Sequence, residues 1–351
     1  MDLIGLGTAT PERRYTKADC WEAFKESPWF ERLERRARTI AELVLQRDNG
    51  IESRWLAVDE LRDAFSIDPD VCHARFEARA PLLAVLAAER ALEDSGLRAT
   101  EIDGVVVSTC TGYLCPGLSG YVLEALDLRA NVQALDLVGQ GCGAALPNWR
   151  VSNALLKSGC ANVLSVCVEL SSAAMYLDND PGVVISACLF GDGAGAAVLS
   201  NQPRTGRRRV QWKTASSLTD PSERGALRFQ TRGGMLRNVL TRPVPKLAAR
   251  YAQRVLGTVL TEQGLQHSDI SGWILHAGGR DVMLAISERL GLSTHDLRHS
   301  AAVLREYGNL SSAFVYFVMQ AALAEGGPGG RWWMASFGAG FSSHGALLEV
   351  E

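Results

Sequence analysis

The sequence lacks a surplus of charge of either sign, and it lacks any long hydrophobic run. Its 351 residues contain 36 Lys and Arg against 39 Asp and Glu, a formal net charge of −3. A protein whose main partner is nucleic acid usually carries a basic surplus, so no such partner is predicted. No apolar run approaches the roughly 18 residues of a membrane span. The first residues carry no basic segment ahead of an apolar stretch, so we expect no secretory signal.

Cysteine patterns that bind metals are also missing. The eight cysteines form no CxxC pair, and none has a histidine at zinc-ligand spacing, so no metal site is predicted. Seven of them are interpreted as small buried side chains in a reducing cytoplasm, which is the expected location. The eighth, Cys142, has a different setting.

The chain contains an internal repeat. Matching residues recur 168 positions apart, at Gly96/Gly264, Leu97/Leu265, Glu101/Asp269, Ile102/Ile270 and Gly104/Gly272. The same offset carries the glycine turn at 139–145 onto another at 307–313, and both lead into helices of small residues. The repeat indicates a duplicated α/β unit, because solenoid repeats recur every 20–50 residues or so. The polar stretch at 200–209 is the predicted boundary between halves 1–205 and 206–351.

Apolar periodicity predicts strands that alternate with helices in both halves. The predicted strands span 105–109, 132–138, 162–169, 193–199, 272–276, 331–336 and 345–350. The predicted helices span 81–95, 142–158, 245–262, 281–290 and 311–325. Such alternation favours mostly parallel sheets covered on both faces. Two stacked copies give an α/β fold with five layers, αβαβα.

Cys142 follows a predicted strand and the turn Gly139-Gln140-Gly141, and it opens a predicted helix. A thiol at a helix N-terminus experiences the positive end of the dipole, which favours the thiolate. Glycines allow the sharp turn and let a substrate approach the backbone. This setting is typical of a nucleophile elbow, with Cys in place of Ser. The alternative is a buried cysteine that serves only packing.

Two further residues join Cys142 as catalytic candidates. His276 ends an apolar strand and faces the glycines that follow it, where active sites of α/β proteins lie. Asn309 lies in the turn that the repeat makes equivalent to that of Cys142. Taken alone, the histidine is more often structural, and the asparagine is more often a helix cap. The duplication favours a shared Cys–His–Asn site, because twofold packing brings the equivalent turns together.

A dinucleotide site is a weaker hypothesis. The run Gly191-Asp192-Gly193-Ala194-Gly195 resembles a glycine loop for phosphates, but a strand follows it where a helix is required. A nicotinamide dehydrogenase is therefore not predicted.

The chain resembles the thiolase superfamily of condensing enzymes and, within it, the type III polyketide synthases related to chalcone synthase. The likeness covers nearly the whole chain, and its motifs are Gln140-Gly141-Cys142, Leu189-Phe190-Gly191-Asp192-Gly193, His276-Ala277-Gly278-Gly279, Tyr307-Gly308-Asn309-Leu310-Ser311-Ser312-Ala313 and Phe337-Gly338-Ala339-Gly340. The resemblance implies a homodimeric acyltransferase without metal or cofactor. Its substrates would be an acyl-CoA starter and malonyl-CoA. Cys142 would carry the chain as a thioester, made more reactive by imidazolium character on His276. His276 and Asn309 would hold the malonyl thioester carbonyl during decarboxylation.

The resemblance also implies residues that line the substrate cavity. Phe190 matches a gatekeeping Phe, and Ser171, Ala174 and Ser311 match cavity positions. Cys115 matches a Met that reaches into the partner's cavity in plant members. Because Ala174 and Cys115 replace larger residues, we expect a fatty or bulky starter, with the product closing as a pyrone or resorcinol.

The sequence departs from the family's pattern at two places. The family's second gatekeeping Phe has no counterpart in residues 233–238. The lysines that bind CoA in the family are not matched either, so Arg54 is the candidate contact for the CoA phosphates.

Two alternatives stay open. A ketoacyl synthase III would use the same triad for one condensation with a carrier protein, but those enzymes usually show His-Gln-Ala-Asn where this chain has His276-Ala277-Gly278-Gly279. An inactive condensing-fold subunit would not need all three candidate residues.

Overall fold

The computed structural model describes residues 1–204, 206 and 208–351. Its largest feature is a mixed sheet with the strand order β11-β12-β13-β8-β1-β7-β6-β4-β5. The sheet divides into two sections, because β1 and β8 pair only at Asp2–Gln211 and Leu3–Val210. The predicted boundary beside residue 205 falls on a residue outside the described range.

The two sections repeat one arrangement. The first contains β1 (Asp2–Ala9), β7 (Gly193–Ser200), β6 (Asn162–Glu169), β4 (Gly104–Ser108) and β5 (Gln133–Leu137). The second contains β8 (Val210–Thr219), β13 (Ser342–Val350), β12 (Gly330–Gly338) and β11 (Ile270–Leu275). Counted outwards from the junction of β1 and β8, each section has two antiparallel strand pairs followed by a parallel strand pair. This correspondence matches the duplicated architecture expected from the repeat.

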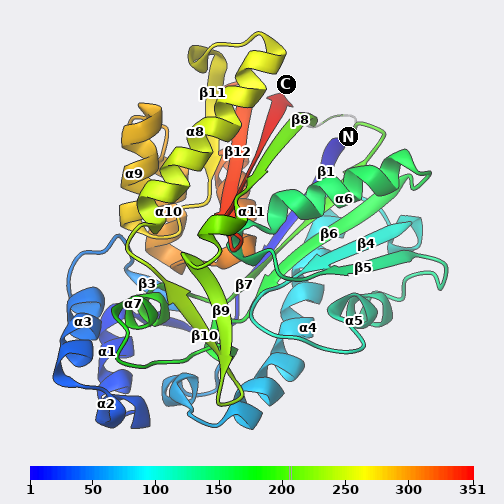
Figure 1. Ribbon diagram of the computed structural model, residues 1–351. Coiled ribbons are helices and arrows are strands. Elements are labelled where there is room, and N and C mark those ends of the chain that lie inside the picture. Colours follow the sequence, from blue (N-terminus) through cyan, green and yellow to red (C-terminus); the bar gives the residue numbers. More distant parts are fainter. Residues whose placement is uncertain (205, 207) are drawn as a thin grey trace.

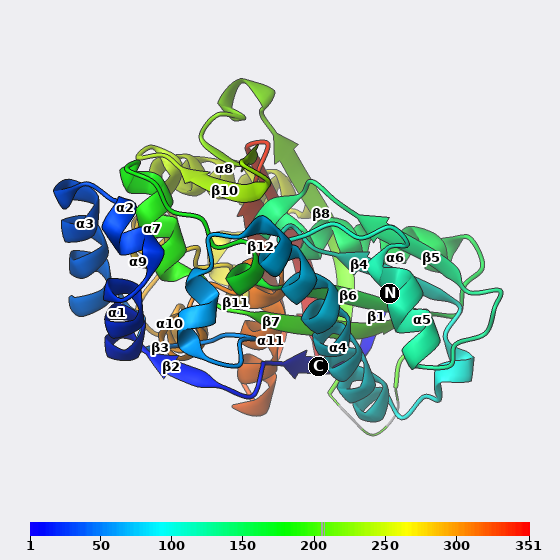
Figure 2. The same ribbon diagram turned by 90° about the horizontal axis from the view of Figure 1, so that it is seen from below.

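Helices complete five layers, as predicted (Figures 1 and 2). Helix α4 (Pro69–Ser95) covers the outer face of β1, β6 and β7, and α8 (Val244–Gln263) covers β8 and β13. Helices α6 (Ala145–Lys157) and α11 (Phe314–Ala324) lie between the two sections and contact strands of both. The side chains of α11 are buried on almost every side, as a helix between two sheets requires.

Three predicted helices begin elsewhere, and the one predicted from residue 311 starts at Phe314. The helix predicted at 81–95 starts at Pro69, because Asp68 caps it and proline is well tolerated in a first turn. The helix continues through Pro81, although proline usually breaks a helix, because the buried face of α4 is packed against the sheet. The helix predicted from residue 142 starts at Ala145, so Cys142 lies in the preceding 3-10 turn η3 (Gly141–Gly143).

Several elements were not predicted, among them β1 and β8, the two strands at which the sections of the large sheet meet. The others are α1 (Lys17–Lys25), α2 (Pro28–Arg32), α3 (Arg35–Gln46), α5 (Leu118–Ala125), α7 (Pro181–Leu189), α10 (Arg298–Tyr307), β2 (Arg14–Thr16), β3 (Ser53–Trp55), β9 (Leu227–Arg232) and β10 (Met235–Leu240). The helix expected at 281–290 is α9 (Arg280–Leu290). Strands β9 and β10 form a separate hairpin in front of α7 (Figure 1). Among the described residues, no helix has the length and apolar character that crossing a membrane requires.

Candidate active site

The site forms where the two repeat-equivalent turns meet. Turn η3 carries Cys142, and turn η7 (Ser311–Ala313) leads into α11; the two turns contact each other. The Ser311 hydroxyl donates to Cys142 Sγ at 3.2 Å. Ser311 adopts a left-handed backbone with φ +51°, which is uncommon for a residue other than glycine and marks a constrained position.

Asn309 connects this turn to the loop that follows β11. Its side-chain amide donates to the Gly278 carbonyl at 3.0 Å, and its Oδ1 accepts from the Ser311 amide at 2.8 Å. The second bond is the turn-capping role named as the alternative for this residue. The first bond holds Asn309 against the loop that begins at His276, so Asn309 serves both purposes.

His276 lies directly after β11, with its backbone amide on the Ala335 carbonyl at 2.9 Å. Its ring packs against Phe314 and Phe337, with centroids 5.3 and 5.0 Å away. Within the described residues neither ring nitrogen has a hydrogen-bond partner. Burial lowers the pKa of His276 to about 3, so the free imidazole is neutral.

Burial of both side chains does not favour the expected pair of thiolate and imidazolium in the free chain. The pKa of Cys142 is raised to about 12, because burial and the nearby carboxylate of Glu169 outweigh the hydrogen bond from Ser311, which lowers it. Cys142 lies in a 3-10 turn, three residues before α6 begins, and not in the first turn of that helix as predicted. Both groups therefore start neutral, because desolvation exceeds the opposing effects.

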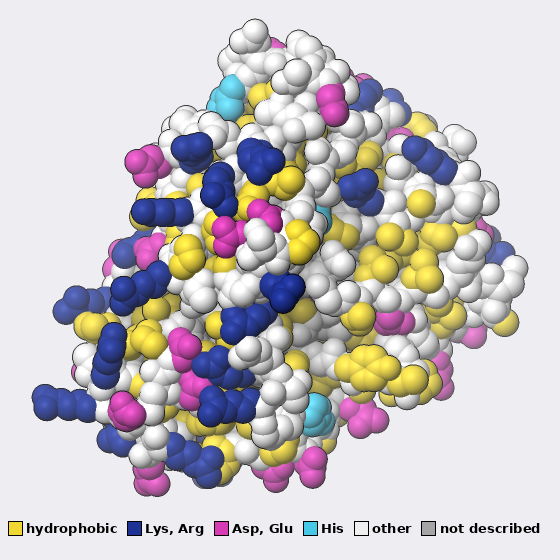
Figure 3. Space-filling view, viewed as in Figure 1, with side chains coloured by type: hydrophobic (Ala, Val, Ile, Leu, Met, Phe, Trp, Pro, Cys, Tyr) yellow, Lys and Arg dark blue, Asp and Glu magenta, His cyan; other side chains and the backbone are white. Residues whose placement is uncertain are grey.

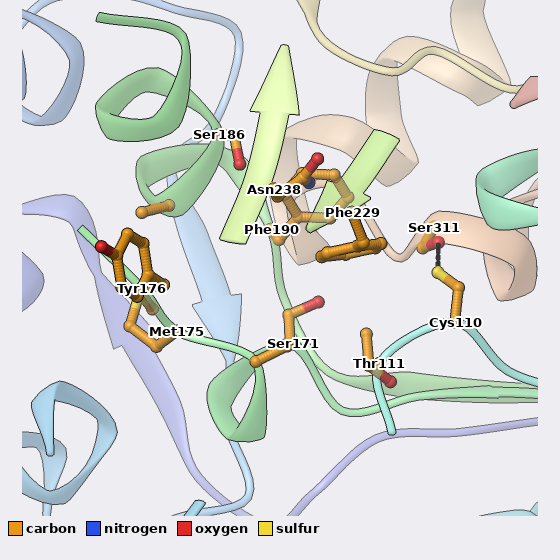
Figure 4. A pocket seen from close by; sticks show the side chains of 12 residues that line it. Cys110, Thr111, Ser171, Met175, Tyr176, Ser186, Phe190, Phe229, Asn238 and Ser311 are labelled. Atoms are coloured by element: carbon orange, nitrogen blue, oxygen red, sulfur yellow. Dashed lines mark hydrogen bonds between the residues drawn. The ribbon is translucent and has the colours of Figure 1, made fainter. Parts of the chain in front are cut away.

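Sequence reasoning missed two polar residues beside the nucleophile. Glu169, fully buried at the end of β6, accepts hydrogen bonds from the Cys110 amide and the Thr111 hydroxyl at 3.0 Å each. Its Oε1 also lies 3.2 Å from the Ser311 hydroxyl, whose one proton is shared between Glu169 and Cys142. Cys110 Sγ lies 3.3 Å from the same Ser311 hydroxyl (Figure 4). The available signal was a lone acid that ends the apolar strand 163–168.

A cavity opens beside this cluster (Figure 4). Its lining residues are Cys110, Thr111, Ser171, Ala174, Met175, Tyr176, Ser186, Ala187, Phe190, Phe229, Asn238 and Ser311. Four of the predicted pocket residues, Phe190, Ser171, Ala174 and Ser311, lie along it. Phe229 was not predicted; it comes from β9 and lines the same cavity as Phe190 (Figure 4).

The other two predicted pocket residues lie apart from this cavity. Arg54 is a wrong prediction as a phosphate contact, because it is buried and donates to the backbone carbonyls of Ala187 and Phe190 at 2.9 and 3.1 Å. It therefore supports the wall behind Phe190. Cys115 is exposed and does not line the cavity of its own chain.

Two family models match the chain. Residues 9–218 match the model described as FAE1/type III polyketide synthase-like protein. Residues 214–349 match the C-terminal domain of chalcone and stilbene synthases.

Individual relatives agree with these matches. A 3,5-dihydroxyphenylacetyl-CoA synthase of Amycolatopsis orientalis is 32% identical over 66% of this chain and 63% of that protein. The enzyme of that name from Streptomyces toyocaensis is 29% identical over 99% of this chain and 89% of its own length. The solved structure of 1,3,6,8-tetrahydroxynaphthalene synthase from Streptomyces coelicolor A3(2), a bacterial type III polyketide synthase, superposes with a TM-score of 0.88 at 25% identity over 99% of both chains.

Proposed function

Because the chain belongs to the type III polyketide synthase family, we propose that the cavity beside Cys142 is where an acyl group from a CoA thioester is extended. The chain is an acyltransferase of the decarboxylative condensing type, which adds malonyl units repeatedly and cyclises the product. We further propose which residues carry out each step and which class of acyl starter the cavity accepts. The observation that carries it is the hydrogen bond from Ser311 to Cys142 at the edge of this cavity.

The first step loads the starter on Cys142. The thiol attacks the acyl-CoA carbonyl, and its proton passes to a ring nitrogen of His276, whose nitrogens are unpartnered within the described chain. The bond from carbon to Cys142 sulfur forms, and the bond to the CoA sulfur breaks. The leaving CoA takes the proton from His276, which returns to its neutral form.

The second step extends the chain. Malonyl-CoA loses CO₂, and the electron pair moves onto the thioester oxygen as an enolate. His276 and Asn309 donate hydrogen bonds to that oxygen. Asn309 uses one amide hydrogen on Gly278, and within the described residues the other has no partner. Each such donor stabilises the transition state by about 3 kcal/mol. The enolate carbon then attacks the Cys142 thioester carbonyl, and the bond from that carbon to the Cys142 sulfur breaks. The longer chain is now a CoA thioester, and Cys142 sulfur attacks it again and displaces CoA.

The two halves divide this chemistry in our proposal. Residues 1–205 supply the nucleophile, and residues 206–351 supply His276 and Asn309. Such a division follows when a duplicated unit places its active site between its copies. Stabilisation of the enolate by hydrogen-bond donors requires neither metal nor cofactor.

The starter is proposed to be fatty or bulky. The cavity wall includes Met175, Tyr176, Phe190 and Phe229, which offer an apolar and aromatic surface, together with the small side chain of Ala174. Such a lining favours burial of an alkyl or aryl group.

We also propose a homodimer formed through β5, at the edge of the sheet. The apolar side chains of Tyr113 and Val138 near this strand are 73% and 58% exposed. Figure 3 shows hydrophobic side chains gathered on the corresponding side of the molecule. An unpaired edge with exposed apolar neighbours is suited to pairing with a second copy of the chain.

We also propose a cytoplasmic location, which fits the eight free cysteines and the use of CoA thioesters.

The test is mass spectrometry of products from a panel of acyl-CoAs with free malonyl-CoA. We expect pyrones or resorcinols that contain several malonyl-derived units, with no carrier protein present. Products of a single condensation that form only with an acyl carrier protein would contradict the proposal and favour the ketoacyl synthase alternative.

A further inference from the structure

The hairpin of β9 and β10 forms one wall of the acyl cavity. Phe229 and Asn238 face each other across the two strands, and both line the cavity. Within the described residues these strands pair only with each other, not with the large sheet. Side-chain contacts, and not strand pairing with the large sheet, must therefore position the hairpin of β9 and β10.

Arg237 supplies the strongest of these contacts. It lies in β10 next to Asn238 and is only 9% exposed. Its Nε donates to Asp178 Oδ2 at 2.7 Å, and its Nη2 donates to Asp180 Oδ2 at 3.1 Å. Its Nη1 donates to Gln230 Oε1 of the paired strand at 3.1 Å. All three guanidinium nitrogens are thus engaged, two of them by carboxylates.

Both carboxylates also order the start of α7. The second oxygen of Asp180 caps the helix by accepting from the Gly182 amide at 2.8 Å. The second oxygen of Asp178 accepts from the Asp180 amide at 2.9 Å. At this point the backbones nearly touch, since a Cβ on Gly182 would lie 1.8 Å from the Leu240 carbonyl oxygen of β10.

Helix α7 contributes the facing wall of the cavity. Ser186 and Ala187 line it from the helix, and Phe190 lines it from the residue that ends the helix. Arg237 therefore joins two walls that are separate in the sequence.

We propose that Arg237 is a specificity-determining positioning residue, whose bonds to Asp178 and Asp180 hold the hairpin against α7 and so set which acyl chains the cavity accepts. The inference rests on the proposed function, since it assumes that the cavity holds the chain carried by Cys142. Neighbouring residues of a strand point to opposite faces, so Arg237 acts through Asn238 and Phe229 and does not touch the chain itself.

The chain provides a matched control in Arg232. This residue also reaches Asp178, at 3.3 Å, but its side chain is 66% exposed, against 10% for Arg237. An exposed pair contributes little to stability or position, whereas a buried one with several bonds fixes geometry.

The experiment compares Arg237→Gln with Arg232→Gln in the full-length enzyme. Acyl-CoAs from acetyl to palmitoyl are supplied, and the rate of Cys142 acylation, kcat/KM and product lengths are measured for each. We expect Arg237→Gln to change the ratio of kcat/KM between long and short starters by about tenfold, because small displacements in a site have effects of that size or larger. Arg232→Gln should keep the native ratio.

An unchanged ratio in Arg237→Gln, with native product lengths, would overturn the proposal even if the melting temperature fell. If this variant does not fold, Arg237→Lys is measured by the same criteria, because it keeps a cation beside the carboxylates. Failure of the proposed function would look different: the unmodified enzyme would then form no acyl adduct on Cys142 with any starter.

Discussion

At the scale of single residues, the site combines a neutral thiol, a neutral imidazole and a tethered amide. Cys142, His276 and Asn309 come from segments far apart in the chain, and Ser311 links two of them through its hydroxyl and its backbone amide. Because His276 is neutral at rest, its proposed role in loading is to accept a proton.

The proposed roles separate when residues are changed one at a time. Cys142→Ala should abolish acyl loading, because no other group replaces the sulfur nucleophile. Asn309→Ala should retain loading but lose roughly 10²–10³-fold in malonyl-CoA decarboxylation, the usual effect of removing one oxyanion donor. Intact-protein mass spectrometry reports loading, and release of labelled CO₂ reports decarboxylation. Equal loss of both steps in Asn309→Ala would contradict the assignment.

The raised pKa of Cys142, about 12, predicts how its alkylation depends on pH. Only the thiolate reacts, so the rate with iodoacetamide should rise about tenfold per pH unit between about pH 7 and pH 10. Ser311→Ala removes a donor that favours the thiolate, so the pKa rises and alkylation slows by about tenfold. In the Cys142→Ala variant the alkylated peptide that contains residue 142 should be absent from the digest, which identifies its signal. A rate that levels off near neutral pH would show that the free enzyme already holds a thiolate.

Glu169 acts on the same thiol with the opposite sign. Its carboxylate raises the pKa of Cys142, so Glu169→Gln should lower that pKa and speed alkylation at a fixed pH. Competition kinetics against free cysteine would measure the change. A slower reaction in Glu169→Gln would mean that this carboxylate supports the thiolate by orienting Ser311, to which it is bonded.

At the scale of elements, the position of α4 on β1 depends on glycine. A Cβ on Gly7 would lie 2.3 Å from the Ala87 carbonyl oxygen, which belongs to the helix backbone. The strand and the helix can approach this closely only because no side chain intervenes.

Gly7→Ala should therefore lower the free energy of unfolding by about 1–3 kcal/mol, the usual effect of forcing extra volume into a packed interior. Gly257 provides the control, since it lies within α8 and a methyl group added there would have no heavy atom within 4 Å. Gly257→Ala should raise stability by up to about 1 kcal/mol through helix propensity. Urea unfolding measures both, and a neutral Gly7→Ala would show that α4 can move away from the strand.

At the scale of the whole molecule, the exposed apolar surface near β5 predicts self-association. Val138→Lys should shift the protein from dimer to monomer, because it places a charge where an apolar contact is expected. Leu284→Lys is the control, since this leucine is 56% exposed but lies on α9, which packs against α8 in the second half of the chain. Light scattering coupled to size exclusion gives the mass. A monomer in the unmodified protein would contradict the proposed dimer.

Much of this architecture was predictable because its signals are local or periodic. The offset of 168 predicted two matching halves, and the strand at 162–169 was predicted at its observed bounds. The glycine turn before Cys142 marked the nucleophile candidate from a few adjacent residues. Hairpin β9–β10 and helix α7 were missed, because their polar and apolar residues follow neither period clearly.

The sequence by itself determined the layered fold, the repeat and the candidate triad, because glycine turns, capping residues and apolar periods act over short distances. The tertiary structure alone decided the electrostatics and the cavity. Burial made Cys142 and His276 neutral at rest, and it turned Arg54 from a candidate phosphate contact into a support for the cavity wall. The reason is physical: desolvation and ion pairing depend on neighbours that the chain brings together only when it folds.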